Sequence, residues 1–512
     1  MKHETVVIVD FGAQYAHLLG KLIRNLNIYS EIVPYTSSRT SIMEKSPHAI
    51  ILIGKSDEKA DEIDKRFDKS ILTLGIPILG IGIGMHLIVK HFNGRSLYEG
   101  NDSYSYQDLS IDYNTTIFRG LNFEENIWLN NKVIIKRLPK EFNSIAHSDV
   151  STIKAIEHIS LPIYGLSFHP EIVENISIGR IIENFLIDIT RITRSWTASS
   201  FIISSIEEIK QKIGHEQVIL GLSGGIDSTV VATLLDRAIG TNLIPIYVNT
   251  GLMRKYETTT IKEFYEKKYS SKIIIVNAEK EFLSALQGVT DPEEKRKIIG
   301  KLFINIFTTE AQKYKNAKWL AQGTVYSDVI ESQLMAGSSL PLKSHHNVGG
   351  LPEIMNLKLI EPIRHLFKDE VRKVGFKLDI PKEFLFRHPF PGPGLAIRII
   401  GEVTKEKVQL LQDIDAILSE ELHAFELYEK VWQGFAVLLP VFSVGMEGDK
   451  RTYAQTCCLR IVNSVDAMTA TFTELPWIFL KKVSTRITNE IQRINKVVYD
   501  ISSKPPSTIE WE

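Results

Sequence analysis

Residues 220–230 read LGLSGGIDSTV, and this stretch decides the fold of the middle of the chain. It joins an apolar strand, a glycine turn and a helix start in immediate succession. Small residues let the main chain approach a ligand closely, and consecutive N–H groups at a helix start form a concave anion site that the helix dipole strengthens. The stretch therefore predicts a phosphate-binding loop, with a tight strand–helix turn capped by Asp as the purely structural alternative. It is not a Walker A loop, because the Lys of that motif is absent.

The polar side chains of the stretch suit phosphate chemistry. The hydroxyl groups of Ser223, Ser228 and Thr229 can donate hydrogen bonds to phosphate oxygens. Asp227 has two possible roles, since it can orient Mg²⁺ on the phosphates or cap backbone N–H groups. Metal binding needs a carboxylate near phosphate oxygens, which this position offers, so we favour the metal role.

Apolar strands and helical segments alternate on both sides of this loop. Further strands are expected at 243–251, 272–278 and 318–323, and a helix at 291–303 that Asp291 caps. The N-terminal third alternates in the same way, with strands expected at 5–10, 49–54, 76–81 and 161–168 and a helix at 14–26. The fold class that follows is α/β, with two doubly wound parallel-sheet domains and then a smaller α+β domain.

The boundaries between these parts are predicted from changes in composition and hydrophobic pattern along the sequence. The polar stretch 193–200 is expected to be a linker, and Ser205 with Glu208 predicts a capping box that opens the next helix. From about residue 395 the pattern becomes β-rich and mixed. The predicted domains are residues 1–195, 205–394 and 395–512.

Charge and cysteine content exclude several classes of protein. Lys plus Arg number 60 and Asp plus Glu 61, so no global field attracts nucleic acid or an anionic membrane. The two cysteines, Cys457 and Cys458, are adjacent, which fits neither a disulfide framework nor a metal site. The start lacks the long apolar region of a secretion signal. We therefore expect a cytoplasmic protein that binds neither nucleic acid nor membrane.

The apolar segment 71–89 is long enough to span a membrane, but its Pro and His favour a buried strand, a turn and a packed helix.

Motifs along the chain resemble one enzyme family. The loop itself resembles the S-G-G-x-D-S pyrophosphate loop of the ATP pyrophosphatases. The other segments that carry the resemblance are DPEEKRKIIG (291–300), AQGTVYSDVIES (321–332), KSHHNVGGLP (343–352), EPIRHLFKDEVR (361–372), RHPFPGPGLAIR (387–398) and YDISSKPPSTIEWE (499–512). Together they closely resemble GMP synthetase, over nearly the whole chain and most specifically after residue 205.

The resemblance implies two half-reactions of purine nucleotide biosynthesis. The C2 oxygen of XMP attacks the α-phosphate of ATP, which gives an adenylyl-XMP intermediate and pyrophosphate. Ammonia then displaces AMP and leaves GMP. The resemblance also implies Mg²⁺ as cofactor, held by Asp227, ATP as co-substrate, and a homodimer formed through a C-terminal domain that also binds XMP.

The same resemblance assigns residues to ligands. The ATP-binding residues are Ser223, Gly224, Gly225, Ile226, Asp227, Ser228 and Thr229, and the XMP-binding residues are Arg296, Pro391, Gly392, Lys504 and Glu510. Lys343 reaches a phosphate and is, with Asp227, a catalytic residue; a solvated surface lysine is its alternative. For Arg296 the alternative is an exposed helix charge paired with Glu293. Rigidity alone is an equal alternative for the loop 389–394.

The N-terminal third resembles a class I glutamine amidotransferase that has lost its nucleophile. The family's elbow reads G-x-C-x-G, whereas residues 80–84 read GIGIG, so Gly82 stands at the nucleophile position. His169 and Glu171 remain as a vestigial dyad, which cannot form the thioester that glutamine hydrolysis needs. The family's S-G-G-P and S-H-G-D segments appear as IGKS (53–56) and NNKV (130–133). These changes predict that free ammonia, rather than glutamine, is the nitrogen donor. Cys457 and Cys458 are expected to be small buried residues rather than substitutes for the missing thiol.

Three other interpretations stay open. A separate glutaminase can feed ammonia to the same synthetase. The chain can be another ATP pyrophosphatase that forms an amide or amidine, such as NAD synthetase, or a thiolation enzyme. It can also be a non-catalytic nucleotide-binding protein, although the intact loop and C-terminus favour catalysis.

Overall fold

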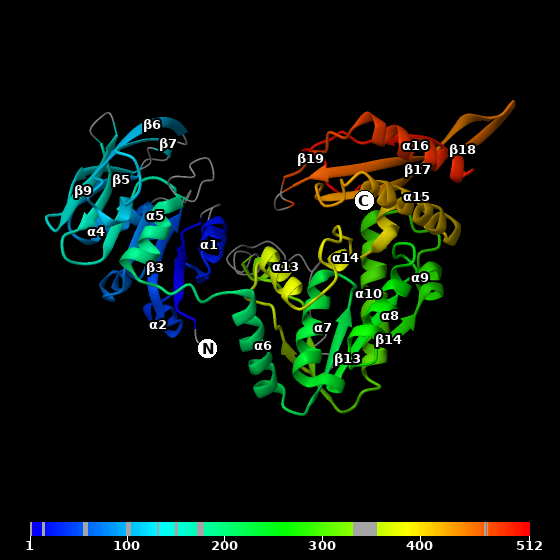
Figure 1. Cartoon of the computed structure of the whole chain (residues 1–512), viewed down its shortest axis with the longest axis horizontal. Coiled ribbons are helices and arrows are strands. Elements are labelled where there is room, and N and C mark those ends of the chain that lie inside the picture. Colours follow the sequence, from blue (N-terminus) through cyan, green and yellow to red (C-terminus); the bar gives the residue numbers. More distant parts are fainter. Residues whose placement is uncertain are drawn as a thin grey trace. The chain divides into compact units, whose positions relative to one another are not determined.

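The computed structural model shows two compact units (Figure 1). The residues that it describes are 3–12, 16–54, 60–98, 104–130, 133–148, 152–170, 179–330, 356–464, 467 and 469–512. Within these residues, the first unit comprises the chain up to Phe201 together with Ile330, and the second comprises 202–329 and 356–512.

The first unit is built on a nine-stranded sheet with the order β2-β1-β3-β4-β11-β10-β9-β6-β7. The strands are β1 (Thr5–Asp10), β2 (Tyr29–Pro34), β3 (Pro47–Gly54), β4 (Ile78–Gly82), β6 (Tyr104–Ile111), β7 (Glu124–Asn130), β9 (Phe142–Ser148), β10 (Ile153–His158) and β11 (Ile163–Leu166). The first five in this order are parallel, as predicted. Among them β1, β4 and β11 are buried along their whole length and are mostly apolar, which suits burial between helices. The last four are antiparallel, an extension that was not predicted from the sequence. Strands β5 (Arg95–Tyr98) and β8 (Val133–Arg137) form a separate pair.

Short helices cover the parallel part of this sheet. They are α1 (Ala16–Asn25), α2 (Arg39–Glu44), α3 (Ala60–Arg66), α4 (Ile83–His91) and α5 (Gly179–Glu183). The apolar segment 71–89 contains β4 and the start of α4, so the prediction of a buried strand, a turn and a packed helix is confirmed. Helix α4 lies close to β3, because a side chain at Gly84 would overlap the main chain of Leu52. None of the helices in the described part of the chain is long and apolar enough to cross a membrane.

The second unit contains a five-stranded parallel sheet with the order β14-β13-β12-β15-β16. Its strands are β12 (Gln217–Leu222), β13 (Leu243–Asn249), β14 (Ile274–Asn277), β15 (Ala317–Ala321) and β16 (Lys358–Ile360). The helices around it are α6 (Ala198–Ile213), α7 (Ile226–Ile239), α8 (Glu257–Lys268), α9 (Glu279–Ala285), α10 (Pro292–Ala311), α13 (Lys368–Lys377) and α14 (Lys382–Leu385). Strands on both sides of β12 place the predicted phosphate-binding loop, residues 223–229 and here termed the phosphate loop, at the centre of the sheet, which is the usual ligand position in this class of fold.

Two helix starts test the capping predictions. Asp291 caps α10 by accepting a hydrogen bond from Glu294 N at 2.8 Å, as predicted. The predicted capping box at Ser205 is wrong, because α6 begins seven residues earlier, at Ala198, and Ser205 is buried in its interior. The reciprocal cap is formed by Thr197 and Ser200, each of which donates its backbone N–H to the other's hydroxyl oxygen, at 2.9 and 3.1 Å.

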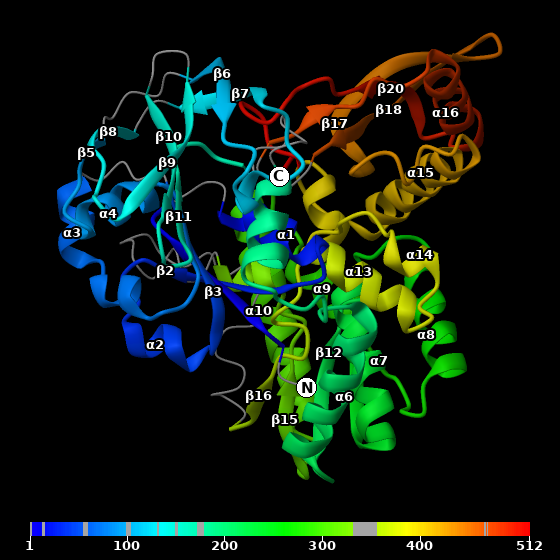
Figure 2. The same cartoon turned by 60° about the vertical axis from the view of Figure 1, so that its left-hand side comes forward.

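The C-terminal part of the second unit is a small α+β layer. Its elements are α15 (Lys405–Ala424), β17 (Gln433–Glu447), β18 (Lys450–Asn463), β19 (Thr471–Phe472), α16 (Trp477–Glu490) and β20 (Ile494–Tyr499). Strand β18 pairs antiparallel with β17 and β19 and parallel with β20. Helices α15 and α16 pack against this sheet (Figure 2). One buried apolar cluster joins Leu252 and Phe282 to Leu411 and Leu459, so this layer and the parallel sheet share a core.

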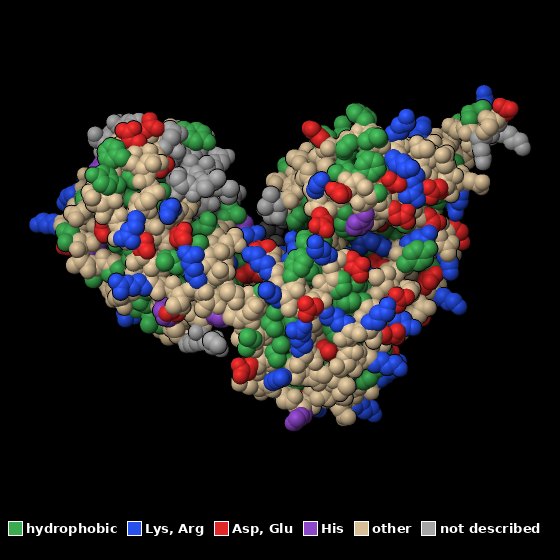
Figure 3. Space-filling view, in the orientation of Figure 1, with side chains coloured by type: hydrophobic (Ala, Val, Ile, Leu, Met, Phe, Trp, Pro, Cys, Tyr) green, Lys and Arg blue, Asp and Glu red, His purple; other side chains and the backbone are tan. Residues whose placement is uncertain are grey.

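The surface of the second unit carries charges of both signs. Lys and Arg side chains are interspersed with Asp and Glu over its visible face (Figure 3). This pattern accords with the near balance of 60 basic and 61 acidic residues.

Candidate active site

The phosphate loop joins β12 to the first turn of α7. Gly224 adopts a φ of +76°, which favours glycine, and a Cβ there would overlap Cδ1 of Ile261. The Gly225 N–H donates to Ser223 Oγ at 3.2 Å, and the Thr229 hydroxyl donates to the Gly225 carbonyl at 2.9 Å. Ser223 and Ser228 hydroxyls lie 3.0 Å apart. Serine and threonine side chains therefore stabilise the turn that precedes a 14-residue helix, whose first N–H groups have no partner within the helix.

Asp227 lies in the first turn of α7 and has one occupied and one vacant oxygen. Its Oδ2 forms an ion pair with Lys368, at the start of α13. Its Oδ1 is buried and has no hydrogen-bond partner among the described residues. A buried carboxylate oxygen without a partner is costly unless a cation or a donor occupies the site. The residue therefore fits the hard oxygen ligation that Mg²⁺ prefers. No cluster of three or more His, Cys, Asp or Glu side chains suited to a metal occurs within the described ranges.

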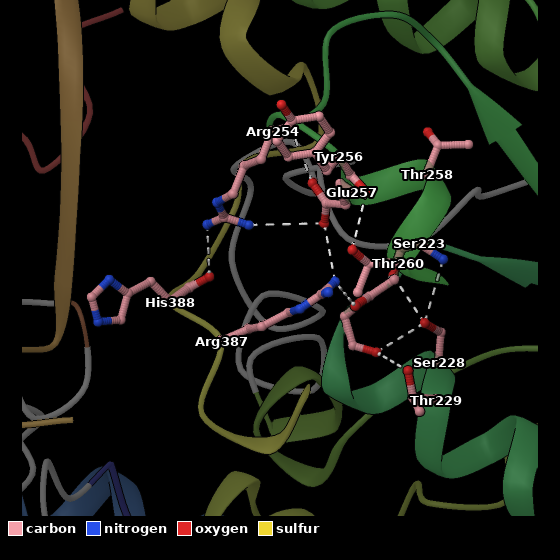
Figure 4. A network of polar contacts seen from close by, with 12 residues as sticks. Ser223, Ser228, Thr229, Arg254, Tyr256, Glu257, Thr258, Thr260, Arg387 and His388 are labelled. Carbon is pink, nitrogen blue, oxygen red and sulfur yellow. Dashed lines mark hydrogen bonds and ion pairs between the residues drawn. The ribbon is translucent and has the colours of Figure 1, made fainter. Parts of the chain in front are cut away.

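Three charged side chains connect the phosphate loop to the segment before the loop 389–394 (Figure 4). Arg387 donates to the Gly224 carbonyl at 3.1 Å and to Glu257 Oε1 at 3.2 Å. Arg254 donates its backbone N–H to Glu257 Oε2 at 3.1 Å and its side chain to the His388 carbonyl at 3.1 Å. Burial lowers the pKa of the Arg387 guanidinium, and the neighbouring Glu257 carboxylate opposes that shift.

His388 is a neutral, buried ring. The Gly434 N–H donates to its Nδ1 at 3.1 Å, so Nδ1 is an acceptor, and Nε2 lies 2.8 Å from the Tyr428 carbonyl, to which it donates its proton. The ring stacks on Tyr428 with centroids 3.9 Å apart. Burial lowers the pKa of His388 below its usual value.

The loop 389–394 is fixed at both ends and open between them. The Gly394 N–H donates to the Pro391 carbonyl at 2.9 Å, and Gln433 donates to the Pro389 carbonyl at 3.2 Å. A Cβ added to Gly392 would meet nothing within 4 Å. Gly392 thus borders open space, and it lies with the half-buried Pro391 where XMP is expected to bind.

The last residues of the chain lie against this loop and α10. Arg398 holds Glu510 through two parallel hydrogen bonds of 3.0 and 2.8 Å, and Gln433 donates to the same carboxylate at 2.9 Å. Arg296 donates to the main-chain oxygen of Glu512, so it is not simply a helix charge paired with Glu293. The structure therefore brings Arg296 and Glu510 into one neighbourhood.

Two lysines in the motifs that carry the resemblance donate to main-chain carbonyls. The Nζ of Lys504 donates to the Ala467 carbonyl at 2.8 Å, so its amino group is already bonded within the protein. Lys295, next to Arg296, is fully buried; it contacts the Glu512 carboxylate and donates to the carbonyls of Ala396 and Ile399 at 3.2 and 2.8 Å.

In the first unit, Gly82 lies at the corner between β4 and α4. Its φ of +59° and ψ of −114° make the sharp strand-to-helix turn of a nucleophile elbow. A Cβ at this position would lie 3.1 Å from His169 Nε2 and 3.1 Å from the Gly54 carbonyl. The structure thus places His169 next to the position where a nucleophilic side chain would begin.

Some residues named in the sequence analysis lie outside the described part of the structure, whereas the prediction for the two cysteines is confirmed. Glu171 and Lys343, together with residues 55–56 and 131–132 of the two divergent segments, lie outside the described residues. Cys457 and Cys458 are buried free thiols, as expected, and burial raises the pKa of both to about 12. Neither is a thiolate near neutral pH.

The charged and polar groups that organise the site were not predicted from the sequence. These residues are Arg254, Glu257, Lys368, Arg387, Arg398, Gln433 and Lys295. Arg387, Arg398, Lys368 and Lys295 fall inside motifs that carried the resemblance, which was an available signal. Glu257 lies in none of those motifs.

Comparison with known proteins identifies the family. A family model for glutamine amidotransferase class-I matches residues 7–189, one for NAD synthase matches 199–298, and one for the GMP synthase C terminal domain matches 420–511. A GMP synthase (glutamine-hydrolyzing) of Brachyspira hyodysenteriae is 47% identical over 509 residues, which cover 99% of each chain. Proteins of the same name from Mesoplasma florum and Fusobacterium nucleatum are each 46% identical and cover 100% of both chains.

The chain belongs to the GMP synthase family. The resemblance drawn from the motifs is thereby confirmed, as is the α/β fold class with its C-terminal antiparallel strands. Membership of the GMP synthase family makes this chain an ATP-using ligase that forms a C–N bond.

Proposed function

We propose that the chain converts XMP to GMP with ATP through an adenylyl-XMP intermediate, and that its nitrogen donor is free ammonia. The observation that carries the donor assignment is Gly82, which supplies no thiol at a corner of elbow geometry beside His169. A base without a nucleophile cannot form a thioester with glutamine. The relatives are named for glutamine hydrolysis, so on this proposal the chain departs from them in its first unit alone.

The phosphate loop performs the first half-reaction on this proposal. Ser223 to Thr229 would hold the pyrophosphate portion of ATP through N–H and hydroxyl groups at the start of α7, which leaves the α-phosphate open to attack. The adenylated oxygen of XMP is a far better leaving group than the original carbonyl oxygen. Ammonia then attacks C2 of the purine and AMP departs, with no covalent enzyme intermediate.

Charge on the phosphates is offset by three kinds of group. Asp227, with its partnerless Oδ1, would hold Mg²⁺, and that ion neutralises charge on phosphate oxygens when bound. The ion pair with Lys368 keeps a second cation beside the same carboxylate. Lys343 is proposed to contribute a further point charge.

The XMP site is proposed to lie where the loop 389–394 meets the C-terminal residues. Glu510, oriented by Arg398, offers carboxylate oxygens to the purine or ribose. Arg296, Pro391, Gly392 and Lys504 complete the proposed set. Of these, Lys504 is the least supported, since its amino group is bonded to the Ala467 carbonyl.

The remaining assignments are also proposals. The domains are residues 1–195, 205–394 and 395–512, the last forming a homodimer, and the enzyme works in the cytoplasm. The exposed apolar side chains Val444, Met446 and Tyr453 near the tip of the β17–β18 hairpin are consistent with a protein partner for this layer.

The test compares nitrogen donors with the purified chain. GMP is measured with ATP, XMP and Mg²⁺ in the presence of either ammonium or glutamine in ammonia-free buffer. We expect GMP with ammonium only, and a rate at fixed total ammonium that rises about tenfold per pH unit near neutrality, because the reactive form is the minor neutral base. Equal rates with glutamine would refute the ammonia assignment.

A parallel assay separates the alternatives. Pyrophosphate release that requires XMP supports GMP synthesis over another ATP pyrophosphatase activity. Nucleotide binding without turnover would instead support a non-catalytic protein. Glutamine-dependent synthesis that appears only when a separate glutaminase is added would support a two-protein system.

A further inference from the structure

Glu257 occupies an unusual position for a carboxylate. It is the first residue of α8, and its side chain is only 6% exposed. Its two oxygens face two arginines. Oε1 accepts from Arg387 at 3.2 Å and lies 3.9 Å from Arg254 Nη1, while Oε2 accepts the Arg254 backbone N–H at 3.1 Å. A buried carboxylate that faces two guanidinium groups is a strong electrostatic tie, because removing it would leave two partly buried cations without compensation.

Each arginine that Glu257 holds also binds a different functional segment. Arg387 donates to the carbonyl of Gly224 in the phosphate loop at 3.1 Å. Arg254 donates to the carbonyl of His388 at 3.1 Å, immediately before the loop 389–394 (Figure 4). The carboxylate is therefore the shared partner of two groups that contact the proposed ATP and XMP sites.

The surroundings of these residues leave them room to move. Glu257, Arg254, Arg387 and His388 all line a cavity of about 170 Å³. Side chains that border a cavity can shift without displacing the close-packed core. A displacement of the Gly224 carbonyl when phosphates bind can thus pass through Arg387 and Glu257 to Arg254.

We propose that Glu257 is a positioning residue that couples ATP binding to XMP binding by holding Arg387 on the phosphate loop and Arg254 on the segment before the loop 389–394. This inference rests on the proposed function, since it takes the two loops as the ATP and XMP sites. Glu257 touches neither substrate; it acts through the two arginines. Charge is essential to the role, because a neutral amide cannot compensate two guanidinium groups.

The test measures the coupling directly. Calorimetry gives the dissociation constant of α,β-methylene-ATP, with Mg²⁺, in the absence and presence of saturating XMP. In the wild type we expect XMP to tighten binding of the analogue about tenfold, within the usual range of coupling between sites. In Glu257→Gln we expect this factor to fall to about twofold or less, with each ligand alone bound within about threefold of the wild type.

Two further variants make the test specific. Arg387→Lys keeps the charge but replaces the rigid guanidinium, whose Nη1 donates to both Gly224 and Glu257, with a flexible ammonium group, so it should lose the coupling as Glu257→Gln does. Glu263→Gln removes an exposed carboxylate from the same helix and should keep the wild-type factor. Thermal melting of each variant verifies folding, and Arg387→Lys carries the test if Glu257→Gln does not fold.

The outcomes are distinct. A wild-type coupling factor in both Glu257→Gln and Arg387→Lys would overturn the inference, as would a wild type that makes GMP without any coupling. Equal loss of coupling in Glu263→Gln would also overturn it. A wild type that neither binds XMP nor releases pyrophosphate in its presence would overturn the proposed function and this inference together.

Discussion

Replacement of Gly224 by alanine is expected to damage the second unit far more than the same change at its neighbour Gly225. At Gly224 the φ of +76° would cost an L residue about 1–2 kcal/mol. The new Cβ would also overlap Cδ1 of the buried Ile261, and overpacking of this kind costs about 1–3 kcal/mol. The two effects together give about 2–5 kcal/mol.

Gly225 is the matched control. Its φ of −77° is ordinary, and a Cβ there would meet only Ser223 Oγ, at 3.3 Å. Alanine at this helix N-cap should cost about 1 kcal/mol or less. The two variants differ by one position in the same loop, so they separate backbone strain and overlap from the general effect of a methyl group.

The assay is thermal unfolding of the full chain, with pyrophosphate release as a second measurement. For a unit of about 300 residues, a loss of about 2–5 kcal/mol lowers Tm by about 3–8 °C. Gly225→Ala should lower Tm by less than about 2 °C. We also expect Gly224→Ala to raise the KM for ATP, because the loop must shift to admit the methyl group. Equal Tm values for the two variants would refute the steric reasoning.

Three further predictions concern the buried residues Lys295 and His388 and the half-buried Asp227. Lys295→Met should lower the free energy of unfolding by about 3–5 kcal/mol, because it leaves the carboxylate of Glu512 buried without its cation. Lys297→Met, at a side chain that is 75% exposed, is the control and should change the free energy of unfolding by less than about 0.5 kcal/mol. Unfolding in urea measures both values. The stability that neutral His388 confers is fully present above its unfolded pKa of 6.5 and is lost as pH falls toward its lowered folded pKa. The free energy of unfolding should therefore fall by up to about 1.4 kcal/mol per pH unit below pH 6.5. His388→Asn should reduce this dependence of the free energy of unfolding on pH. Asp227→Asn should raise the Mg²⁺ concentration for half-maximal pyrophosphate release at least about tenfold. It should also give a smaller rise in Tm with Mg-ATP than the wild type shows. An unchanged Mg²⁺ titration of pyrophosphate release would contradict the metal role of Asp227.

Features encoded by adjacent residues could be predicted from the sequence. The phosphate loop needs only a strand, small residues and a helix start in order, and all of these lie within residues 217–239. The elbow at Gly82 is equally local. Its neighbour His169 was found through the family motif, since nothing local links two residues so far apart in the chain.

Features built from distant residues were not predicted. Arg387 bonds Glu257 across 130 residues and Gly224 across 163, and neither pairing leaves a periodic trace in the sequence. The false capping box at Ser205 has a related cause. The pattern S-x-x-E fits a helix start, but burial of Ser205 in the interior of α6 overrides it, and Thr197 with Ser200 supplies the real cap.

The shape of the elbow in the first unit does not depend on its missing chemistry. A non-glycine residue at φ +59° stores about 1–3 kcal/mol of strain, which glycine avoids. The turn is fixed instead by close packing, because a side chain at Gly84 would overlap Leu52 and one at Gly80 would lie 2.6 Å from the Gly84 carbonyl carbon. These contacts do not involve a thiol at position 82, so loss of the nucleophile leaves the packing of the corner in place. In the phosphate loop the two requirements coincide, since the glycine that shapes the turn is also proposed to present the main chain to phosphate. Substitution of that glycine is expected to alter both the fold and the activity of the second unit. At the elbow, by contrast, loss of the nucleophile removes the chemistry and leaves the fold of the corner intact.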